Sequence, residues 1–284
     1  MALLDWYAPR RRAFPWRRTR DPYRILVAEV MLQQTQAARV ARAYPAFLRR
    51  FPSVRALARA TRAEVVAAWD GLGYNRRALA LAECARAVVR DHGGRLPRDV
   101  ASLRALPGVG PYTASAIAAI AFGEPVPALD VNVRRVVARS RLGAEPDAVE
   151  PAAVERAARR ALDRRDPGAW NQAVMDVGRE HCRPRPRCAG CPLARGCRFR
   201  RAGAPPAPPR RRAEPFEGSR RQVRGAVVRA LRGGPASVAG LAARTGFPPS
   251  RLAEAIDGLV RDGLVSAGPA ARAGAPGGRA RLRS

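Results

Sequence analysis

Apolar residues recur every three to four positions over most of the chain, which predicts a mainly helical protein. A helix is expected to start after Asp21, where a proline takes its first position. One face of that helix would carry four residues spaced at i, i+4, i+7 and i+11: Ile25, Glu29, Leu32 and Gln36. Further helices are expected between 44 and 98, over 151–164 and over 170–181. The fold class expected from this pattern is all-α.

The centre of the chain contains a glycine-rich turn, LPGVG at 106–110, ahead of an apolar helix. Pro111 takes the first position of that helix, where its missing N–H is no loss. Gly108 and Gly110 allow a tight turn whose amides would face an anion such as a phosphate. An ordinary helical turn is the alternative interpretation.

Two carboxylates stand out by their expected surroundings. Glu29 lies in an apolar stripe, so burial should raise its pKa and suit it to act as a general acid. A buried glutamate paired with an arginine is the alternative. Asp130 precedes the helix expected over 131–139 in the N-cap position, where the helix dipole favours the ionised form; a plain cap is the alternative. The two groups are expected to differ in protonation state.

Four of the five cysteines fall within sixteen residues, in the pattern C-x5-C-x2-C-x5-C: Cys182, Cys188, Cys191 and Cys197. In a cytoplasmic chain this spacing indicates a ligand set rather than two disulfides. Four thiolates suit either one zinc ion or a four-iron four-sulfur (4Fe–4S) cluster, and the spacing alone does not separate them. Cys84, alone on an apolar helix, is expected to be a small buried residue.

The chain is strongly basic, with a net charge of +30 in which all 53 basic residues are arginine. Such an excess indicates a polyanionic partner, with nucleic acid first and an anionic membrane surface a distant second. An arginine-biased genome would explain arginine over lysine but not basic over acidic residues. No apolar run reaches membrane-spanning length and the N-terminus lacks a signal-peptide apolar region, so we expect a cytoplasmic protein.

The motifs together resemble the adenine glycosylase (MutY) branch of the helix-hairpin-helix DNA glycosylases. The sequence AEVMLQQTQ at 28–36 matches that family's signature almost letter for letter. The sequences LPGVGPYTA at 106–114 and LDVNVRR at 129–135 are similar to its hairpin and downstream aspartate. This resemblance implies a two-lobed fold and a 4Fe–4S cluster on the four cysteines, although five residues separate the first two where the family usually has six.

The resemblance also implies roles for single residues. Glu29 would protonate adenine and Asp130 would stabilise the oxocarbenium-like sugar, as the two carboxylates of glycosidases do. Tyr112 and Asn132 would orient these two groups. Four positions match the family's base-recognition residues: Trp16, Arg17, Leu32 and Gln172. From the residue alone, a solvent-facing amide is the alternative for Gln172.

Five positions match the family's contacts to DNA: Gln34, Tyr74, Gly108, Val109 and Gly110. Gln34 and Tyr74 would enter the duplex while the target base is flipped out. Read without the resemblance, Tyr74 is expected to pack under its glycine-rich turn. The expected partner is double-stranded DNA with adenine mispaired with guanine or 8-oxoguanine.

The implied activity is that of a monofunctional adenine glycosylase. Related bifunctional enzymes carry a Schiff-base lysine at the position of Tyr112, and this chain contains no lysine, so no lysine-dependent strand cleavage is expected. Two alternatives remain. One is a relative that acts on mismatched thymine or oxidised pyrimidines, and the other is a noncatalytic DNA-binding regulator.

The chain divides by composition into four parts. The resemblance covers about residues 1–200, with the cysteine loop at 182–197, and a Pro/Arg-rich linker is expected over 201–214. Residues 215–267 predict three helices and a strand, as in a winged-helix-like module, and 268–284 is expected to be disordered. Longer family members end in a Nudix-like domain that needs more residues than remain here. We expect a monomer, and the sequence names no protein partner.

Overall fold

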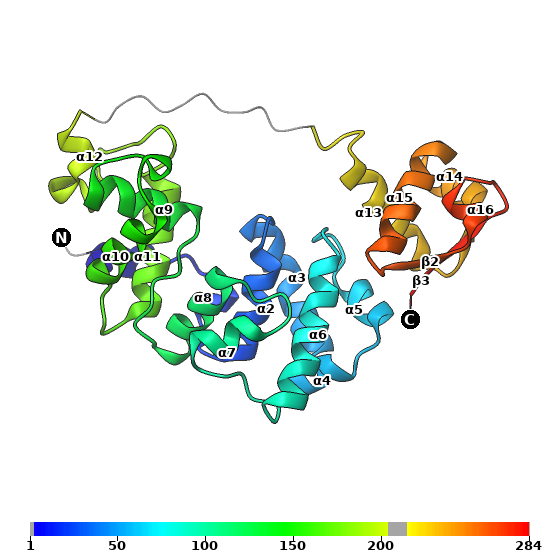
Figure 1. The fold of residues 1–284 in the computed structure, drawn as a ribbon, viewed down its shortest axis with the longest axis horizontal. Coiled ribbons are helices and arrows are strands. Elements are labelled where there is room, and N and C mark those ends of the chain that lie inside the picture. The colour runs from blue at the N-terminus through cyan, green and yellow to red at the C-terminus, as the bar shows by residue number, and fades with distance from the viewer. Residues whose placement is uncertain (1–2, 204–214, 284) are drawn as a thin grey trace. The chain divides into compact units, whose positions relative to one another are not determined.

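The computed structural model describes residues 3–203 and 215–283, and most of these are helical (Figure 1). The chain forms two compact units, each made of two stretches of sequence. The first unit comprises Met1–Val30 and Arg95–Arg210, and the second comprises Met31–Gly94 and Arg211–Ser284. The region expected to be one glycosylase domain is therefore shared between two units. Apart from 201–203, the linker expected over 201–214 lies outside the described residues.

The first unit is built from helices around a core of valine and tryptophan side chains. Its helices are α1 (Leu3–Tyr7), α2 (Pro22–Leu32), α7 (Val100–Ala105), α8 (Pro111–Phe122), α9 (Val131–Val137), α10 (Pro151–Ala161), α11 (Pro167–Glu180) and α12 (Arg198–Arg201). Short 3-10 turns lie at Ala8–Arg10, Pro15–Arg17, Pro146–Ala148 and Ala194–Gly196, and a π-helical turn follows α9 at Ala138–Leu142. In the core, α9 and α11 pack together through Val133, Val137, Val174 and Val177. This packing fixes the two helices that carry much of the candidate site.

Helix α11 begins three residues earlier than the sequence pattern predicts. The Asp166 side chain accepts a hydrogen bond from the amide of Ala169, and Pro167 takes the first helical position. These two residues together start the helix at Pro167 rather than at Trp170.

Helix α2 ends at Leu32, which corrects the helix face expected from the sequence. Gln34 has a left-handed backbone conformation, with φ of 56°, and this ends the helical path. Gln36 lies beyond that turn at the N-cap of α3. It therefore does not share a helical face with Ile25 and Glu29, which are both buried in α2.

The second unit combines four helices from the first half of the chain with the C-terminal module. The four helices are α3 (Ala37–Arg50), α4 (Val54–Arg59), α5 (Arg62–Ala68) and α6 (Arg76–Asp91). The module contains α13 (Arg220–Leu231), α14 (Val238–Thr245), α15 (Pro249–Arg261) and α16 (Pro269–Arg272), with strands β1 (Ala236–Ser237), β2 (Val265–Ala267) and β3 (Arg279–Leu282). Val66 of α5 packs in the same apolar core as the buried side chains of the module.

Residues 269–272 form α16 and residues 279–282 form β3, so the disorder expected over 268–284 is wrong for the part that the structure describes. Strand β3 lies between β1 and β2 and pairs antiparallel with both. Ala280 is buried at the centre of this sheet, opposite Ala236 and Ala267. Helices α13, α14 and α15 and strand β2 correspond to the three helices and the strand that the sequence predicts, and the structure adds α16, β1 and β3.

In the described part of the chain, no helix combines the length and apolar character needed to cross a membrane.

Candidate active site

Glu29 is a buried carboxyl group in the first unit, with only 6% of its surface exposed. Its pKa is raised from 4.5 to about 7, first by burial and then by the charge of Asp130, while the positive charge of Arg17 opposes the rise. The Tyr112 hydroxyl forms a hydrogen bond with the Glu29 carboxyl and also favours the ionised form. The rise in pKa expected from the apolar stripe is confirmed.

Tyr112 links the Glu29 carboxyl to helix α11. Its hydroxyl lies 3.5 Å from the sulfur of Met175. Burial, and then the charges of Glu29 and Asp130, raise the pKa of this tyrosine well above its usual value, so it stays protonated and able to donate a hydrogen bond.

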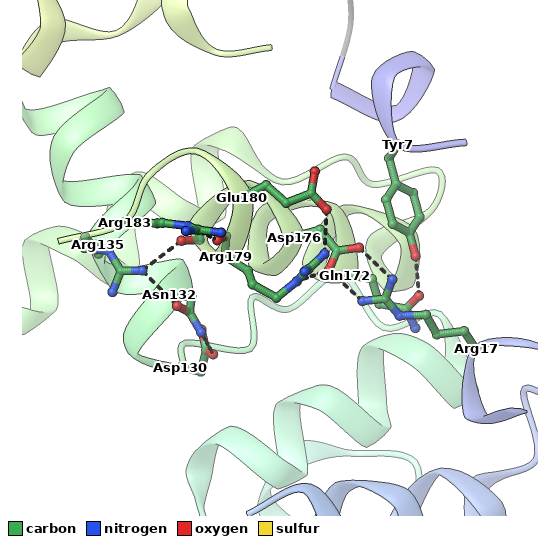
Figure 2. A network of polar contacts seen from close by, with 11 residues as sticks. Tyr7, Arg17, Asp130, Asn132, Arg135, Gln172, Asp176, Arg179, Glu180 and Arg183 are labelled. Atoms are coloured by element: carbon green, nitrogen blue, oxygen red, sulfur yellow. Dashed lines mark hydrogen bonds and ion pairs between the residues drawn. The ribbon is translucent and has the colours of Figure 1, made fainter. Parts of the chain in front are cut away.

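Asp130 caps the N-terminus of α9, as the sequence predicts. Its Oδ1 atom accepts a hydrogen bond of 2.7 Å from the amide of Val133. Its Oδ2 atom accepts one of 2.9 Å from the side chain of Asn132, whose own oxygen accepts from Arg135 at 2.8 Å (Figure 2). Both carboxylate oxygens are therefore held in place at the positive end of a helix dipole.

A glycine allows α11 to approach this capped helix end closely. A Cβ atom added at Gly178 would lie 2.7 Å from the Cβ atom of Asn132 and 3.3 Å from its Cα atom. Arg135 also bridges the two helices, because it donates a hydrogen bond of 3.0 Å to the carbonyl of Gly178. The position of Asn132, and with it that of Asp130, depends on this contact.

A second polar network lies on α11 and includes two of the predicted base-recognition residues (Figure 2). Arg17 donates two hydrogen bonds to the carboxylate of Asp176, at 2.6 and 3.0 Å. The Tyr7 hydroxyl donates one of 2.6 Å to the side-chain oxygen of Gln172. Gln172 is buried, so its alternative as a solvent-facing amide is wrong. Trp16 is also buried, and its ring stacks on that of Phe14 with centroids 4.7 Å apart.

Sequence reasoning missed Asp176 and Tyr7. Asp176 lies four residues after Gln172, on the same face of α11, so its position on that helix was available as a signal. Its partner Arg17 is 159 residues away, and nothing local in the sequence indicates their pairing. Tyr7 carries no sequence signal beyond being aromatic.

The hairpin between α7 and α8 agrees only in part with the predicted anion-binding turn. Gly108 has φ of 74°, a left-handed conformation that favours glycine, whereas Gly110 is extended at the N-cap of α8. The side chain of Val109 is buried, and its amide donates to the carbonyl of Leu106 at 3.1 Å. The amide of Val109 is therefore used within the turn rather than directed at an anion.

Two further predicted DNA contacts, Gln34 and Tyr74, belong to the second unit. Among the described residues they are the only non-glycine residues with positive φ, at 56° and 49°. Tyr74 is 47% exposed, so the alternative of a ring packed under its turn is wrong. Leu32, predicted to recognise the base, also lies in this unit and is partly buried. The predicted site residues are therefore divided between the two units.

Arg77 joins the two loops that carry Gln34 and Tyr74. Its guanidinium donates to the carbonyls of Met31 and Gln33, at 2.9 and 2.5 Å, in one loop. It also donates to the carbonyls of Leu72 and Gly73, at 3.2 and 3.1 Å, in the other. Burial lowers the pKa of this arginine to about 10, which leaves it charged at neutral pH. Sequence reasoning missed this residue, whose contacts span more than forty positions.

The four clustered cysteines form no disulfides in the described part of the chain, and their charges influence one another. Burial raises the pKa of Cys191, and the charges of the other three cysteines raise it further. Arg139 approaches the sulfur of Cys182 at 3.8 Å, and Arg135 donates to its carbonyl at 2.6 Å. Within residues 3–203 and 215–283, no three His, Cys, Asp or Glu side chains lie close enough to hold a metal ion.

Cys84 differs from the four clustered cysteines. It is buried in α6, and burial raises the pKa of its thiol to about 12, as expected for a small apolar residue without a ligand role.

Comparisons with known proteins identify the family of the chain. The family model described as "HhH-GPD superfamily base excision DNA repair protein" matches residues 27–162. An adenine DNA glycosylase of Mycobacterium tuberculosis is 41% identical over 271 residues, which cover 93% of this chain and 89% of that protein. An adenine DNA glycosylase of Homo sapiens is 43% identical over 211 residues, which cover 70% of this chain and 39% of that protein.

Solved structures show the same fold. A thermostable thymine-DNA glycosylase has a TM-score of 0.65 at 32% identity, with 70% of this chain and 94% of that chain covered. Endonuclease III in a non-covalent DNA complex has a TM-score of 0.59 at 24% identity, with 71% and 94% covered, and supports the fold alone. Together, the helical fold and the extent of the sequence identity show that the chain is a base excision repair DNA glycosylase that belongs to the adenine DNA glycosylase (MutY) family of the HhH-GPD superfamily.

Proposed function

We propose that this protein hydrolyses the N-glycosidic bond of adenine mispaired with guanine or 8-oxoguanine in double-stranded DNA. The observation that carries the proposal is the burial of the Glu29 carboxyl, which raises its pKa. With a pKa of about 7, a substantial fraction of this buried carboxyl keeps its proton at neutral pH and can give it to a leaving base. Adenine DNA glycosylases are also among the most similar relatives of the chain.

Asp130 supplies the second group that the reaction needs. Loss of a base from deoxyribose leaves a positively charged, oxocarbenium-like sugar, which a nearby carboxylate stabilises. Asp130 fits this role because Asn132 and the amide of Val133 hold both of its oxygens. Tyr112 orients Glu29 through the hydrogen bond between their side chains. Glu29 thus acts as the acid, and Asp130 as the stabilising anion.

Recognition of the base and entry into the duplex are assigned to separate groups. Trp16, Arg17 and Gln172 form a buried polar and aromatic group in the same unit as Glu29, which suits contacts to a flipped base. The exposed ring of Tyr74 and the side chain of Gln34 suit insertion into the base stack. Leu32, Gly108 and Gly110 keep their assignments as base and backbone contacts. Val109 shapes the turn.

We propose that Cys182, Cys188, Cys191 and Cys197 hold a 4Fe–4S cluster, with zinc as the alternative. The support is the chemistry of the donor set, because the loop supplies four sulfur donors, and the charges of Arg139 and Arg135 favour the ionised form of Cys182 against the effect of burial. Such a cluster would fix the loop at 182–197 against α9 and α11, and no step of base removal passes through it.

Strand cleavage through a lysine imine is not part of the proposal. The chain contains no lysine, and Tyr112 occupies the position where the hairpin of bifunctional relatives carries one. The product should therefore be an intact strand with an abasic site.

The test is a single-turnover assay on a duplex with one adenine opposite 8-oxoguanine or guanine, for the wild type and Glu29→Gln. We expect strand breaks only after alkali treatment, and a loss of at least a hundredfold in rate for the variant, which keeps its shape but has no acidic proton. The wild-type rate should fall as pH rises above about 7, because Glu29 then loses its proton.

The same assay separates the alternatives. A thymine/uracil-DNA glycosylase is 33% identical to this chain over 203 residues, so duplexes with mismatched thymine and with an oxidised pyrimidine are run in parallel. Release of either base with adenine left in place would assign another substrate. Strand breaks without alkali would contradict the monofunctional mechanism, and binding without release of any base would favour a noncatalytic regulator.

A further inference from the structure

The second unit contains a groove that the proposed reaction does not account for. Its volume is about 1270 Å3, and helix α13 lines one side of it. The loops that carry Gln34 and Tyr74 line the other, together with the start of α3. The C-terminal module thus faces the same groove as the two residues predicted to enter the duplex.

Polar and apolar contacts join the module to these loops within the unit. Arg221 of α13 donates a hydrogen bond of 3.3 Å to the hydroxyl of Tyr74. Arg232 forms an ion pair of 2.8 Å with Asp70, in the turn before Tyr74. Burial opposes the ionised form of Asp70, but Arg232 outweighs it and lowers the pKa of that carboxyl. Together with Val66 in the core of the module, these contacts fix α13 as a wall of the groove.

The groove is strongly cationic. Eight arginines and two aspartates line it, which leaves six positive charges. Both aspartates already have arginine partners, because Asp70 pairs with Arg232, and Asp262 pairs with Arg224 and Arg76. Arg221 and Arg229 are both exposed on α13 and add charge to this side of the groove. Only an anion of high charge density matches such a surface.

Aromatic and amide groups in the groove favour a nucleic acid over an acidic protein. The ring of Tyr74 is half exposed, and Phe216, also in the lining, is 62% exposed. Exposed aromatic rings beside arginines are typical of surfaces that hold phosphates and stack on bases. An acidic peptide would neutralise the arginines but would leave these rings without a specific partner.

We propose that α13 is a DNA-contacting wall, on which Arg221 and Arg229 bind backbone phosphates of the duplex that Gln34 and Tyr74 enter. The inference rests on the proposed function, because it takes the duplex substrate from there. It assigns DNA binding to the C-terminal module, and it gives Arg221 a second task, which is to hold the hydroxyl of Tyr74.

The test measures binding of the full-length chain to a fluorescent, fully paired duplex over a range of salt concentrations. The double variant Arg221→Ala/Arg229→Ala should lower the slope of log K against log salt by about two, because each phosphate contact contributes about 0.9. At about 0.15 M salt its Kd should rise on the order of tenfold. The matched control, Arg244→Ala/Arg281→Ala, removes two exposed arginines of the same module outside the groove and should keep the wild-type slope.

Two more measurements make the outcome decisive. Arg221→Lys/Arg229→Lys keeps both charges and should restore the slope, and Arg229→Ala alone should lower it by about one if the double variant does not fold. An unchanged slope in the double variant overturns the proposal. If the double variant keeps the wild-type slope for DNA but binds a polyglutamate peptide more weakly than the wild type does, the groove fits an acidic protein instead. The duplex in this test carries no mismatch, so the binding result does not depend on base removal. A failure of adenine release in the excision assay would therefore contradict the proposed function without deciding whether α13 binds DNA.

Discussion

Glu29 links catalysis to stability at the scale of a single residue. Its pKa is about 7 in the folded chain against 4.5 for the ordinary group, so the folded state holds a proton that the unfolded state releases between these values. The stabilisation by this group is complete below about pH 4.5 and is lost as pH rises through 7. This difference between the pKa values of the folded and unfolded states corresponds to about 3 kcal/mol.

We therefore expect Glu29→Gln to stabilise the protein in a pH-dependent way. At about pH 8 the free energy of unfolding should exceed that of the wild type by up to about 3 kcal/mol, and near about pH 4 the difference should almost vanish. Urea unfolding at both pH values measures this, with the exposed Asp147→Asn as the control. An equal gain at both pH values would show that the charge of Glu29 is not the cause.

Local sequence signals were sufficient for the residues whose role depends on their own helix. The apolar stripe placed Glu29 in a buried position, and the helix start placed Asp130 at an N-cap. Pairings between distant positions had no such signal. The bonds of Arg77 to the Met31 and Gln33 carbonyls, and the ion pair between Arg17 and Asp176, arise only when the chain folds.

At the scale of elements, the site depends on how closely α11 approaches α9. We expect Gly178→Ala to destabilise the protein by about 1–3 kcal/mol, because the new Cβ atom would lie 2.7 Å from that of Asn132 and the helices must move apart. The same shift should displace Asp130 and slow adenine release. Thermal unfolding and single-turnover rates measure the two effects.

Gly225→Ala is the matched control for this helix contact. Gly225 also lies inside a helix, but a Cβ atom there meets nothing within 4 Å, so the change should stabilise the chain by up to about 1 kcal/mol through helix propensity alone. If both variants changed stability alike, close helix packing would not be the reason for glycine at Gly178.

Element boundaries were predictable where the pattern was local. The strand expected within residues 215–267 exists as β2, and three helices lie before it, as apolar periodicity predicts. Strand β3 was missed because residues 279–282 are stabilised by pairing with β1 and β2, which are distant in the sequence. Gln36 was misplaced because the left-handed backbone of Gln34 is not encoded in hydrophobic periodicity.

At the scale of the whole molecule, the chain order does not match the division into units. Each unit combines two separate stretches, and the boundary at Val30 and Met31 falls within α2, only one residue after Glu29. Sequence composition could detect the Pro/Arg-rich break before the C-terminal module, but not this division. The proposed catalytic pair and the cysteine loop belong to the first unit, so a change in the stability of that loop should change the stability of the first unit.

The cysteine loop is joined to the helices of the first unit through arginine side chains. Arg139 donates to the carbonyls of Arg183 and Pro184, at 2.5 and 3.0 Å, and is almost fully buried. If the loop detached, these donors would lose partners inside the protein, which is unfavourable for a buried charge. Loss of the proposed cluster should therefore weaken α9, α10 and α11.

We expect Cys191→Ser to lose iron and visible absorbance, and to lose hydrogen-exchange protection in those three helices, while α13 and α15 of the second unit keep theirs. The reason is that a missing thiolate ligand weakens the cluster and frees a loop bonded only to elements of the first unit in the described structure. Cys84→Ala, a buried cysteine without a ligand role, should keep its iron. If the purified wild-type protein contains zinc rather than iron, the zinc alternative is correct and the cluster proposal is wrong. An equal loss of hydrogen-exchange protection in both units would contradict a stabilising role confined to the first unit.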